Sequence, residues 1–481
     1  AVENDRKMRT FGFHRAARQA AGNLDGETTA LLEAYSRGVN DYFDDNAEDL
    51  PELFARLVLV PEPWTPADCI LSWWHVGQFF ATDGTRDLMH YRNLRQGRQP
   101  GRPNARGRGG RPGATGRRPP APGHAPMPPD DSTAVVQRGD VSDAWLEKAR
   151  AFLEEHGFAE DSVAASSTGS PGPKFSHAWV VDGKTTGTGA AVLVSDPQTP
   201  VANPSLFHEF HIQGRSFNAR GIGVAGSPAI LIGWNRRVAW GLTALGADQA
   251  DLFRLKTDPE RPDQYEFDGE WRAMEVLREE IRVKDGPAQS MTIRRTHLGP
   301  VVNEFAFAAP GDPPVALKRV PMCEPERETI RAALAMLRAG DVREFHAALA
   351  DWRFPTANVV FGDAEGRIGF SLAGALPLRS PLALDAGSAA HDGSDSKHDW
   401  RAIIPHGLMP HVIQPGRGAL FSGNHRPVGV FYPIPLGIRT GAMGDTVRSW
   451  RLRELLEGKT SLTPKQVLDV HYDAVNPARR T

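Results

Sequence analysis

Cysteine is scarce in this 481-residue chain, which contains only Cys69 and Cys323. Two cysteines so far apart form neither a disulfide framework nor a metal cluster, so we expect both thiols to be buried and unreactive. Long apolar runs are also missing, since none reaches the roughly 18 residues that a membrane-spanning helix needs. The formal net charge is −2, and the chain as a whole therefore predicts neither a nucleic-acid partner nor an acidic membrane surface.

The first residues, AVENDRKMRTFGFH, lack an initiator methionine and the basic-then-apolar pattern of a signal peptide. A mature chain and a truncated chain would both begin in this way, so these residues leave the compartment open. Hydrophobic residues make up 40% and charged residues 24% of the chain, which is typical of a globular protein.

Residues 1–165 are predicted to be mainly helical. In ETTALLEAYSRGVNDYF, apolar residues recur at spacings of three and four, as they do on one face of an amphipathic helix. PWTPADCILSWWHVGQFF repeats this pattern, with Pro66 and Asp68 near the expected start of a helix. SDAWLEKARAFLEEHGF is a third helical segment.

An insert at about residues 95–130 interrupts the helical region. It consists largely of arginine, glycine and proline, so it cannot bury a core and is predicted to be disordered. No aromatic residues interleave with the arginines, which disfavours an RGG-type nucleic-acid segment. A flexible insertion and a reading-frame artefact in a GC-rich gene would have the same composition, and the sequence does not separate them.

From residue 176 onward, short strand patterns alternate with turn residues, for example in AWVVDG, AAVLVSD, LFHEFHIQG, PAILIGW and RVAWGLT. One helix is predicted over ERETIRAALAMLRAGDVREFHAALADW and another over RSWRLRELLEG. Helices followed by a strand-rich block predict an α+β hydrolase core. We therefore divide the chain into a helical region (1–165), a spacer (166–175) and a core (176–481).

Three short motifs suggest a cofactor or a metal. GIGVAG at residues 221–226 matches a dinucleotide fingerprint, but a strand pattern follows it where the fingerprint requires a helix, so we interpret it as a turn. In HEFH, His208 and His211 lie three residues apart on a predicted strand and face opposite sides, which disfavours zinc. DQAD brings Asp248 and Asp251 together, either as a solvated acidic turn or as part of a calcium site.

The segment PKFSHAWVVDG places a hydroxyl residue, Ser176, where a Pro/Gly-rich stretch ends and a strand begins. Neither a turn nor the start of a strand requires a serine. The residue makes chemical sense if the bond between Phe175 and Ser176 is cut, because the new α-amine would have a pKa of about 7.7–8.0 and could act as general base for its own hydroxyl. The alternative is a serine that merely opens a strand.

The residues around this serine carry a family resemblance. SHAWVVDGKTTGTGAAVLVSDPQ resembles the start of the β-chain in the penicillin acylase (penicillin amidase) family of N-terminal nucleophile hydrolases. The likeness continues through GSPAILIGWNRRVAWGLTALGADQADLF, HLGPVV, FPTANVVFGDAEGRIGFSLAGALPLR and SGNHRP, and it reaches back to LLEAYSRGVNDYF. It implies an α+β fold with an αββα four-layer sandwich behind a helical α-chain region, and one precursor that cuts itself into α- and β-chains.

The resemblance also implies roles for individual residues. Ser176 would be both the nucleophile and the amine base. Gln198 matches the residue whose backbone holds that amine. Ala244 and Asn424 match the two oxyanion donors, through a backbone N–H and a side-chain amide. Arg448 matches the arginine that orients Asn424 and assists processing.

Part of a calcium site is implied in the same way. Asp248, the carbonyl of Ala250 and Asp251 match three of its ligands, so the resemblance implies a structural Ca²⁺ and no organic cofactor. The calcium-binding glutamate expected in the helical region has no match that we can place.

Three further positions match residues that line the family's acyl pocket, namely Thr199, Ile232 and Thr243. The first of these positions is aromatic in penicillin G acylases. Thr199 departs from that pattern and puts a preference for aryl-acetyl groups in doubt.

The family's β-chain usually continues for some hundreds of residues beyond the end of this sequence, so we expect the C-terminal part of the β-chain to be missing. The implied activity is hydrolysis of a linear amide bond in a small-molecule N-acyl substrate of the penicillin or cephalosporin type, in a periplasmic or secreted protein. Acyl-homoserine lactones are the alternative substrates. A truncated, non-catalytic acylase-like protein is the alternative from another class.

Overall fold

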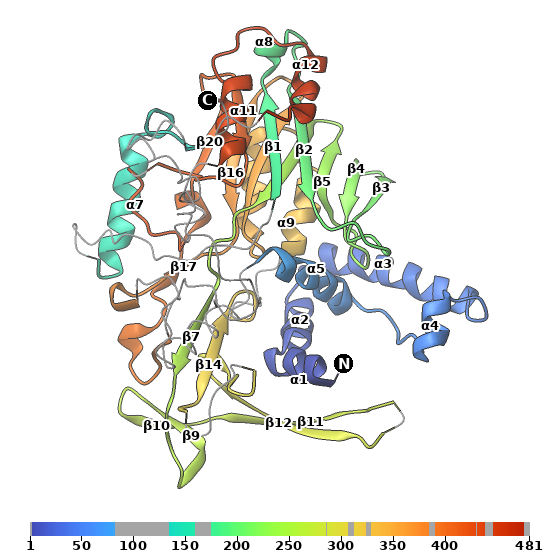
Figure 1. Cartoon of the computed structure of the whole chain (residues 1–481), viewed down its shortest axis with the longest axis vertical. Coiled ribbons are helices and arrows are strands. Elements are labelled where there is room, and N and C mark those ends of the chain that lie inside the picture. Colours follow the sequence, from blue (N-terminus) through green and yellow to red (C-terminus); the bar gives the residue numbers. More distant parts are fainter. Residues whose placement is uncertain are drawn as a thin grey trace, which may run out of the picture.

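The computed structural model describes residues 2–81, 134–158, 175–284, 286–305, 312–323, 329–383, 390–429, 431–437 and 446–475 (Figure 1). The insert predicted at 95–130 lies outside the described residues. So does the predicted spacer, except for Phe175, which is the first residue of a strand.

The described part of the N-terminal region consists mainly of helices. Asp25 caps one of them by accepting a hydrogen bond from the Thr28 backbone N–H, and that helix buries Leu32. Thr65 and Asp68 form a capping box at the start of another. The helices are α1 (Val2–Phe11), α2 (Phe13–Gly22), α3 (Gly26–Asp45), α4 (Glu52–Leu57), α5 (Pro66–Phe80) and α7 (Asp143–Glu155).

Two antiparallel sheets form the centre of the molecule. The smaller sheet has the order β2-β1-β21, so β1 is its central strand. Its strands are β1 (Phe175–Val181), β2 (Val192–Gln198) and β21 (Ala419–Ser422). The larger sheet has the order β20 (His411–Ile413), β16 (Ile368–Ala373), β15 (Ala357–Asp363), β6 (Val238–Ala244), β5 (Ile230–Asn235), β4 (Asn218–Gly223) and β3 (His208–Gln213).

The two sheets pack face to face. Val180 of β1 belongs to the same buried cluster as Val360 of β15 and Phe370 of β16. At Gly241 of β6 the sheets approach so closely that a Cβ atom there would lie 2.6 Å from the Ser195 Cβ atom of β2. Glycine is therefore required at this position, because no other residue would let the strands pack at this distance.

Helices cover the outer side of each sheet. Trp179 of β1 shares a buried cluster with Leu452 of α11 (Val447–Leu456), and α12 (Pro464–Asp469) belongs to the same cluster. On the larger sheet, Phe345 of α10 (Val342–Ala348) packs against Trp240 and Phe361, with ring centroids 5.4 and 4.9 Å apart. The strand alternation of β1 therefore sends successive apolar residues into two different clusters.

The single continuous helix that we predicted over residues 326–352 is wrong, because the structure breaks it in two. The described part forms two helices, α9 (Thr329–Met336) and α10, followed by the short η3 (Leu349–Asp351). Asp341 is the N-cap of α10 and accepts hydrogen bonds from the backbone N–H groups of Arg343 and Glu344. Gly340 and Asp341 therefore end one helix and begin another.

A smaller all-β part extends from the sandwich, and in Figure 1 its β11–β12 hairpin lies at the bottom. Its strands are β7 (Ala250–Arg254), β8 (Lys256–Asp258), β9 (Arg261–Phe267), β10 (Glu270–Ala273), β11 (Glu275–Ile281), β12 (Gln289–Thr296), β13 (Gly299–Pro300), β14 (Val315–Arg319) and β18 (His391–Asp392). The remaining elements are η2 (Arg138–Asp140), α8 (Gly183–Thr186), β17 (Pro377–Leu378), η4 (Pro381–Ala383), η5 (Ser396–His398), β19 (Ala402–Ile403), η6 (His406–Leu408) and η7 (Val470–Tyr472).

The structure decides several of the motif interpretations. GIGVAG begins within β4 and leads through a turn into β5, so the helix that a dinucleotide site needs does not follow it. His208 and His211 both lie on β3, in agreement with the strand interpretation. Cys69 is buried as expected, whereas Cys323 is exposed, which corrects the expectation of two buried thiols. Within the described ranges, no helix has both the length and the apolar character needed to cross a bilayer.

Candidate active site

Ser176 lies at the start of β1, the central strand of the smaller sheet, and is only 7% exposed. Its backbone nitrogen donates a hydrogen bond to Asn424 Oδ1 at 2.9 Å. Asn424 Nδ2 in turn donates to Ser176 Oγ at 3.0 Å. One side-chain amide therefore binds both the nitrogen and the hydroxyl of this residue.

Asn424 follows β21 in a backbone conformation that few residues adopt. Its φ is +58°, in the left-handed region, which a non-glycine residue occupies at an energetic cost and often at functional sites. The turn is held by Thr446, whose hydroxyl donates to the Gly423 carbonyl at 3.0 Å. It is also held by His425 Nδ1, which accepts from the Gly423 N–H at 3.2 Å.

His425 is fully buried beside this asparagine and is neutral. Burial, together with the positive charges of Arg453, Arg426 and Arg448, lowers the pKa of its imidazole to about 3. A neutral imidazole has the lone pair that the Gly423 N–H requires. His425 therefore helps to fix the Asn424 conformation, a role that the sequence did not indicate.

Ala244 ends β6 in the larger sheet, and its carbonyl accepts a hydrogen bond from Asn424 Nδ2 at 2.9 Å. The same amide group therefore links Ala244 to Ser176, from strands of two different sheets. The contact uses the carbonyl of Ala244, and the role of its backbone N–H as an oxyanion donor stays a prediction.

Arg448 lies in the first turn of α11 and points back into this group. It donates hydrogen bonds to the Ser176 carbonyl and, at 2.8 Å, to Asn424 Oδ1. Burial lowers the pKa of the Arg448 guanidinium, and the charge of Asp196 opposes that shift. Because Arg448 occupies Asn424 Oδ1, it fixes which end of the amide faces the Ser176 hydroxyl.

Gln198 ends β2 and lies opposite Phe175 in the register of the two strands. Its side chain is directed to Asp196, since Nε2 donates to Asp196 Oδ2 at 2.9 Å. The predicted contact between the Gln198 backbone and an amine on Ser176 stays a prediction.

The three predicted acyl-pocket residues lie on or beside central strands. Thr199 follows β2, Ile232 is on β5, and Thr243 is on β6 next to Ala244. Thr243 is fully buried, and its hydroxyl forms a hydrogen bond of 2.7 Å with Ser422 Oγ, which also accepts from Asn358 Nδ2 at 3.3 Å. Their part in binding an acyl group stays a prediction.

The sequence did not indicate Ser422 or Asn358, although both lie in segments that carry the family resemblance. Asn358 lies among apolar residues at the start of ANVVFGD, and a buried amide in a central strand is the signal that could have indicated it.

The carboxylates of DQAD are buried, so the interpretation as a solvated acidic turn is wrong. Arg379 Nε donates to both oxygens of Asp251, at 3.1 and 2.8 Å, and Trp400 Nε1 donates to Asp251 Oδ2 at 2.5 Å. Burial alone would raise the pKa of Asp251, but the charges and hydrogen bonds of Arg379 and His391 together outweigh burial and lower it. His391 Nε2 lies 3.5 Å from Asp251 Oδ1 and acts in the same direction.

The same guanidinium also binds Asp248, whose carbonyl accepts from Arg379 at 3.2 Å and whose Oδ2 lies 3.7 Å from it. Ala250 is fully buried, and its N–H donates to Asp248 Oδ1 at 3.2 Å. A fixed positive charge thus lies against both carboxylates. The residues present do not fit a Ca²⁺ ion at this position, because the cation would have to displace Arg379.

An apolar cavity of about 540 Å³ lies away from these clusters, between α1, α2, α5 and the turns around residues 205 and 225. None of the predicted site residues lines it. Its lining includes Phe13, Leu71, Val76, Leu206 and Val224.

Comparison with known proteins agrees with the geometry. The chain is 25% identical to an acyl-homoserine lactone acylase from Pseudomonas fluorescens, over 98% of this chain and 54% of the relative. It is 26% identical to a penicillin acylase 2 proenzyme from a Pseudomonas species, over 99% of this chain and 58% of the relative. The chain thus spans about half the length of these curated relatives.

A solved structure, a thermostable penicillin G acylase from Alcaligenes faecalis, superposes with a TM-score of 0.53 at 26% identity. The match covers 62% of this chain and 52% of that structure. Over the matched part, the two packed sheets of this chain are thus similar in fold to those of that acylase. The model of the penicillin amidase family matches residues 1–481, and the chain belongs to that family.

Proposed function

We propose that the protein hydrolyses a linear amide bond and releases an acyl group from an amine, with Ser176 as the nucleophile. The observation that carries the proposal is the 3.0 Å hydrogen bond between Asn424 Nδ2 and Ser176 Oγ. An amide N–H at this distance from the attacking oxygen can also reach the negative charge that develops beside it.

Processing would come first. Ser176 Oγ attacks the Phe175 carbonyl carbon, the peptide C–N bond breaks, and the nitrogen takes a proton to become the free α-amine of Ser176. Water then hydrolyses the resulting ester, which restores the hydroxyl and leaves Phe175 with a carboxylate. The products are an α-chain and a β-chain that begins SHAWVV.

The mature enzyme would use the same hydroxyl on its substrate. The Ser176 amine takes the proton of Oγ while Oγ attacks the substrate carbonyl, and the oxyanion is held by Asn424 Nδ2 and the Ala244 N–H. The amine product leaves with that proton, and water cleaves the acyl ester. Arg448 keeps the Asn424 amide in the correct orientation, while Gln198 would hold the amine and Thr199, Ile232 and Thr243 would line the acyl pocket.

The substrate is proposed to be an N-acyl compound of the penicillin or cephalosporin type. Acyl-homoserine lactones are the second candidates, because four relatives with that activity in their names match at least 95% of this chain. We also propose the four-layer αββα arrangement, which the helices on the outer side of each sheet support. The proposed location is periplasmic or secreted.

The proposal is tested by a denaturing gel with N-terminal sequencing, combined with amine-release assays on penicillin G and on an N-acyl-homoserine lactone. Two chains, the second beginning SHAWVV, and release of an amine from either substrate are expected. A single uncut chain that releases no amine would instead support the non-catalytic alternative.

A further inference from the structure

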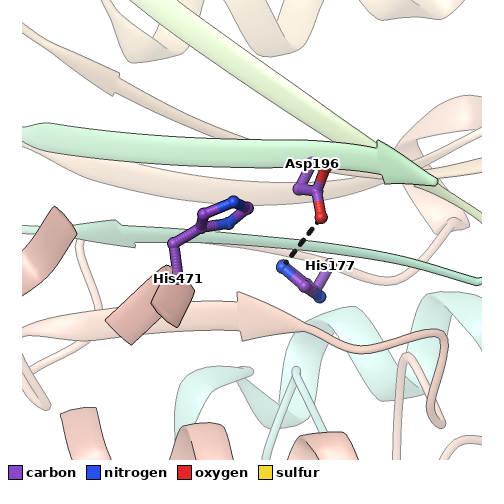
Figure 2. Close-up of side chains that lie close together, drawn as sticks. All are labelled: His177, Asp196 and His471. Carbon is purple, nitrogen blue, oxygen red and sulfur yellow. Dashed lines mark ion pairs between the residues drawn. The ribbon is translucent and has the colours of Figure 1, made fainter. Parts of the chain in front are cut away.

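A second group of polar side chains lies next to the Ser176 site, on three elements (Figure 2). His177 of β1 and Asp196 of β2 are directly opposite each other in the strand register. His471 lies in η7, and in Figure 2 its ring is directed toward the other two side chains. One ligand atom from each residue lies within 4.8 Å of the other two.

We propose that His177, Asp196 and His471 bind a divalent transition-metal ion of the Zn²⁺ class. Two imidazoles and one carboxylate are a common donor set for zinc, and three protein ligands leave a fourth position for water. The proposal does not depend on acylase activity.

The nitrogen that would bind the metal is available. His177 Nε2 is buried, forms no hydrogen bond with any described residue, and lies 3.3 Å from Asp196 Oδ2. A buried ring nitrogen without a hydrogen-bond partner among the described residues can bind a metal ion.

Gln198 supports the carboxylate. Its Nε2 donates to Asp196 Oδ2 at 2.9 Å and lies 3.5 Å from His177 Nδ1. This contact orients Asp196 toward His177, as partners around metal ligands commonly do. A bound ion would link η7 to the strand that carries Ser176.

The test is a titration of the metal-depleted protein with Zn²⁺, followed by competition with a chromophoric chelator, and a parallel titration with Co²⁺. We expect one ion per chain and visible d–d absorption from bound Co²⁺. His471→Ala removes a ligand outside the Ser176 group and should weaken Zn²⁺ binding by about 100-fold or more. Asp196→Asn keeps the size of the side chain and should give a similar loss.

His208→Ala is the matched control, since His208 is an exposed histidine on β3 of the other sheet. It should bind Zn²⁺ as the parent does. The proposal is overturned if His471→Ala binds as tightly as the parent, if His208→Ala loses as much affinity, or if Co²⁺ gives no d–d absorption. A melting curve without metal checks that each variant is folded.

A different observation, the buried contacts of Arg379, carries a second proposal. We infer that this guanidinium is the permanent cation of the Asp248 and Asp251 cluster, in the place where the family resemblance implies Ca²⁺. Arg379 is 5% exposed, and the carboxylates of Asp248 and Asp251 are fully buried. Water therefore cannot screen these charges, and the carboxylates need a cation within the protein.

The test measures the melting temperature of the parent with excess chelator and with added Ca²⁺. Both should leave it unchanged within about 1 °C, whereas Arg379→Met should lower it by about 5 °C or more, because two buried carboxylates lose their cation. Arg220→Met, at an exposed ion pair with Glu209, is the control and should change little. A rise of the parent's melting temperature with Ca²⁺, reversed by chelator, would overturn the inference.

Discussion

At the scale of single residues, Asn424 has the largest role in the site. It binds the nitrogen and the hydroxyl of Ser176, the Ala244 carbonyl and the Arg448 guanidinium. The amide has two donors and one acceptor oxygen, and these four contacts use all of them. A side chain so fully bound has a fixed position before any substrate arrives, which is what electrostatic stabilisation of an oxyanion requires.

Ser176→Ala should block both processing and turnover, because one hydroxyl serves both steps. The methyl group fits the same space, so the protein should stay folded. A denaturing gel should show one uncut chain, and amine release should fall to the background. Two chains cut at residue 176 in this variant would show that another residue attacks the Phe175 carbonyl.

Asn424→Ala should lower kcat by about 10²–10³-fold with a much smaller change in KM, because its amide is needed where negative charge develops. The measurement is a steady-state assay with the substrate that the parent hydrolyses. Asn218→Ala, on β4 of the larger sheet, is the control and should leave kcat unchanged. An unchanged kcat in Asn424→Ala would remove this residue from the oxyanion site.

At the scale of elements, the start of α11 positions the site. Thr446 caps this helix, because its hydroxyl accepts from the Ser449 N–H, and the same hydroxyl donates to the Gly423 carbonyl. The cap therefore fixes Arg448, which lies two residues later, against the turn that contains Asn424. A helix terminus and a strained turn are thus joined through one hydroxyl group.

Thr446→Ala should cost about 1 kcal/mol of stability as a lost N-cap, and it should also lower kcat because Arg448 and Asn424 lose their alignment. Thr463→Ala removes the N-cap of α12 and should cost a similar amount without changing kcat. Urea unfolding and kinetics of the two variants give the comparison. Equal kcat values in both would show that the cap contributes to folding only.

The sequence predicted the elements with a strong local signal. The helices α3, α5, α7 and α11 have apolar periodicity and capping residues, whereas the α9–α10 break depends on the weaker signal of Gly340 and Asp341. Of the site, the family motifs indicated Ser176, Asn424 and Arg448. Arg379 was missed because it lies 128 residues from Asp251, and no local pattern reports a pairing made only by the fold.

At the scale of the whole molecule, buried histidines make the stability of the folded state depend on pH. Burial lowers the pKa of six described histidines, namely His14, His177, His297, His346, His406 and His425. For His346 the value falls to about 3, because burial acts together with the neighbouring charges of His406 and His411. In the folded protein the pKa of each of these side chains therefore lies below the value of about 6.5 that histidine has in an unfolded chain, and His346 and His425 stay neutral well below it.

This difference predicts that the protein loses stability in acid. Above pH 6.5 both states hold neutral histidines and the stabilisation is complete. As the pH falls from about 6.5 toward 3, His346 and His425 become protonated in the unfolded state but stay neutral in the folded state. Each of these two histidines then lowers the free energy of unfolding by up to about 1.4 kcal/mol per pH unit. Urea unfolding at pH 7.5, 6.0 and 5.0 should show the decline.

His346→Gln should have a shallower pH dependence than the parent, while His208→Gln, at an exposed position on β3, should follow the parent. A parent whose free energy of unfolding stays constant between pH 7.5 and 5.0 would mean that these imidazoles are protonated in the folded state, and the neutral His425 acceptor that holds the Gly423 N–H beside Asn424 would then be wrong.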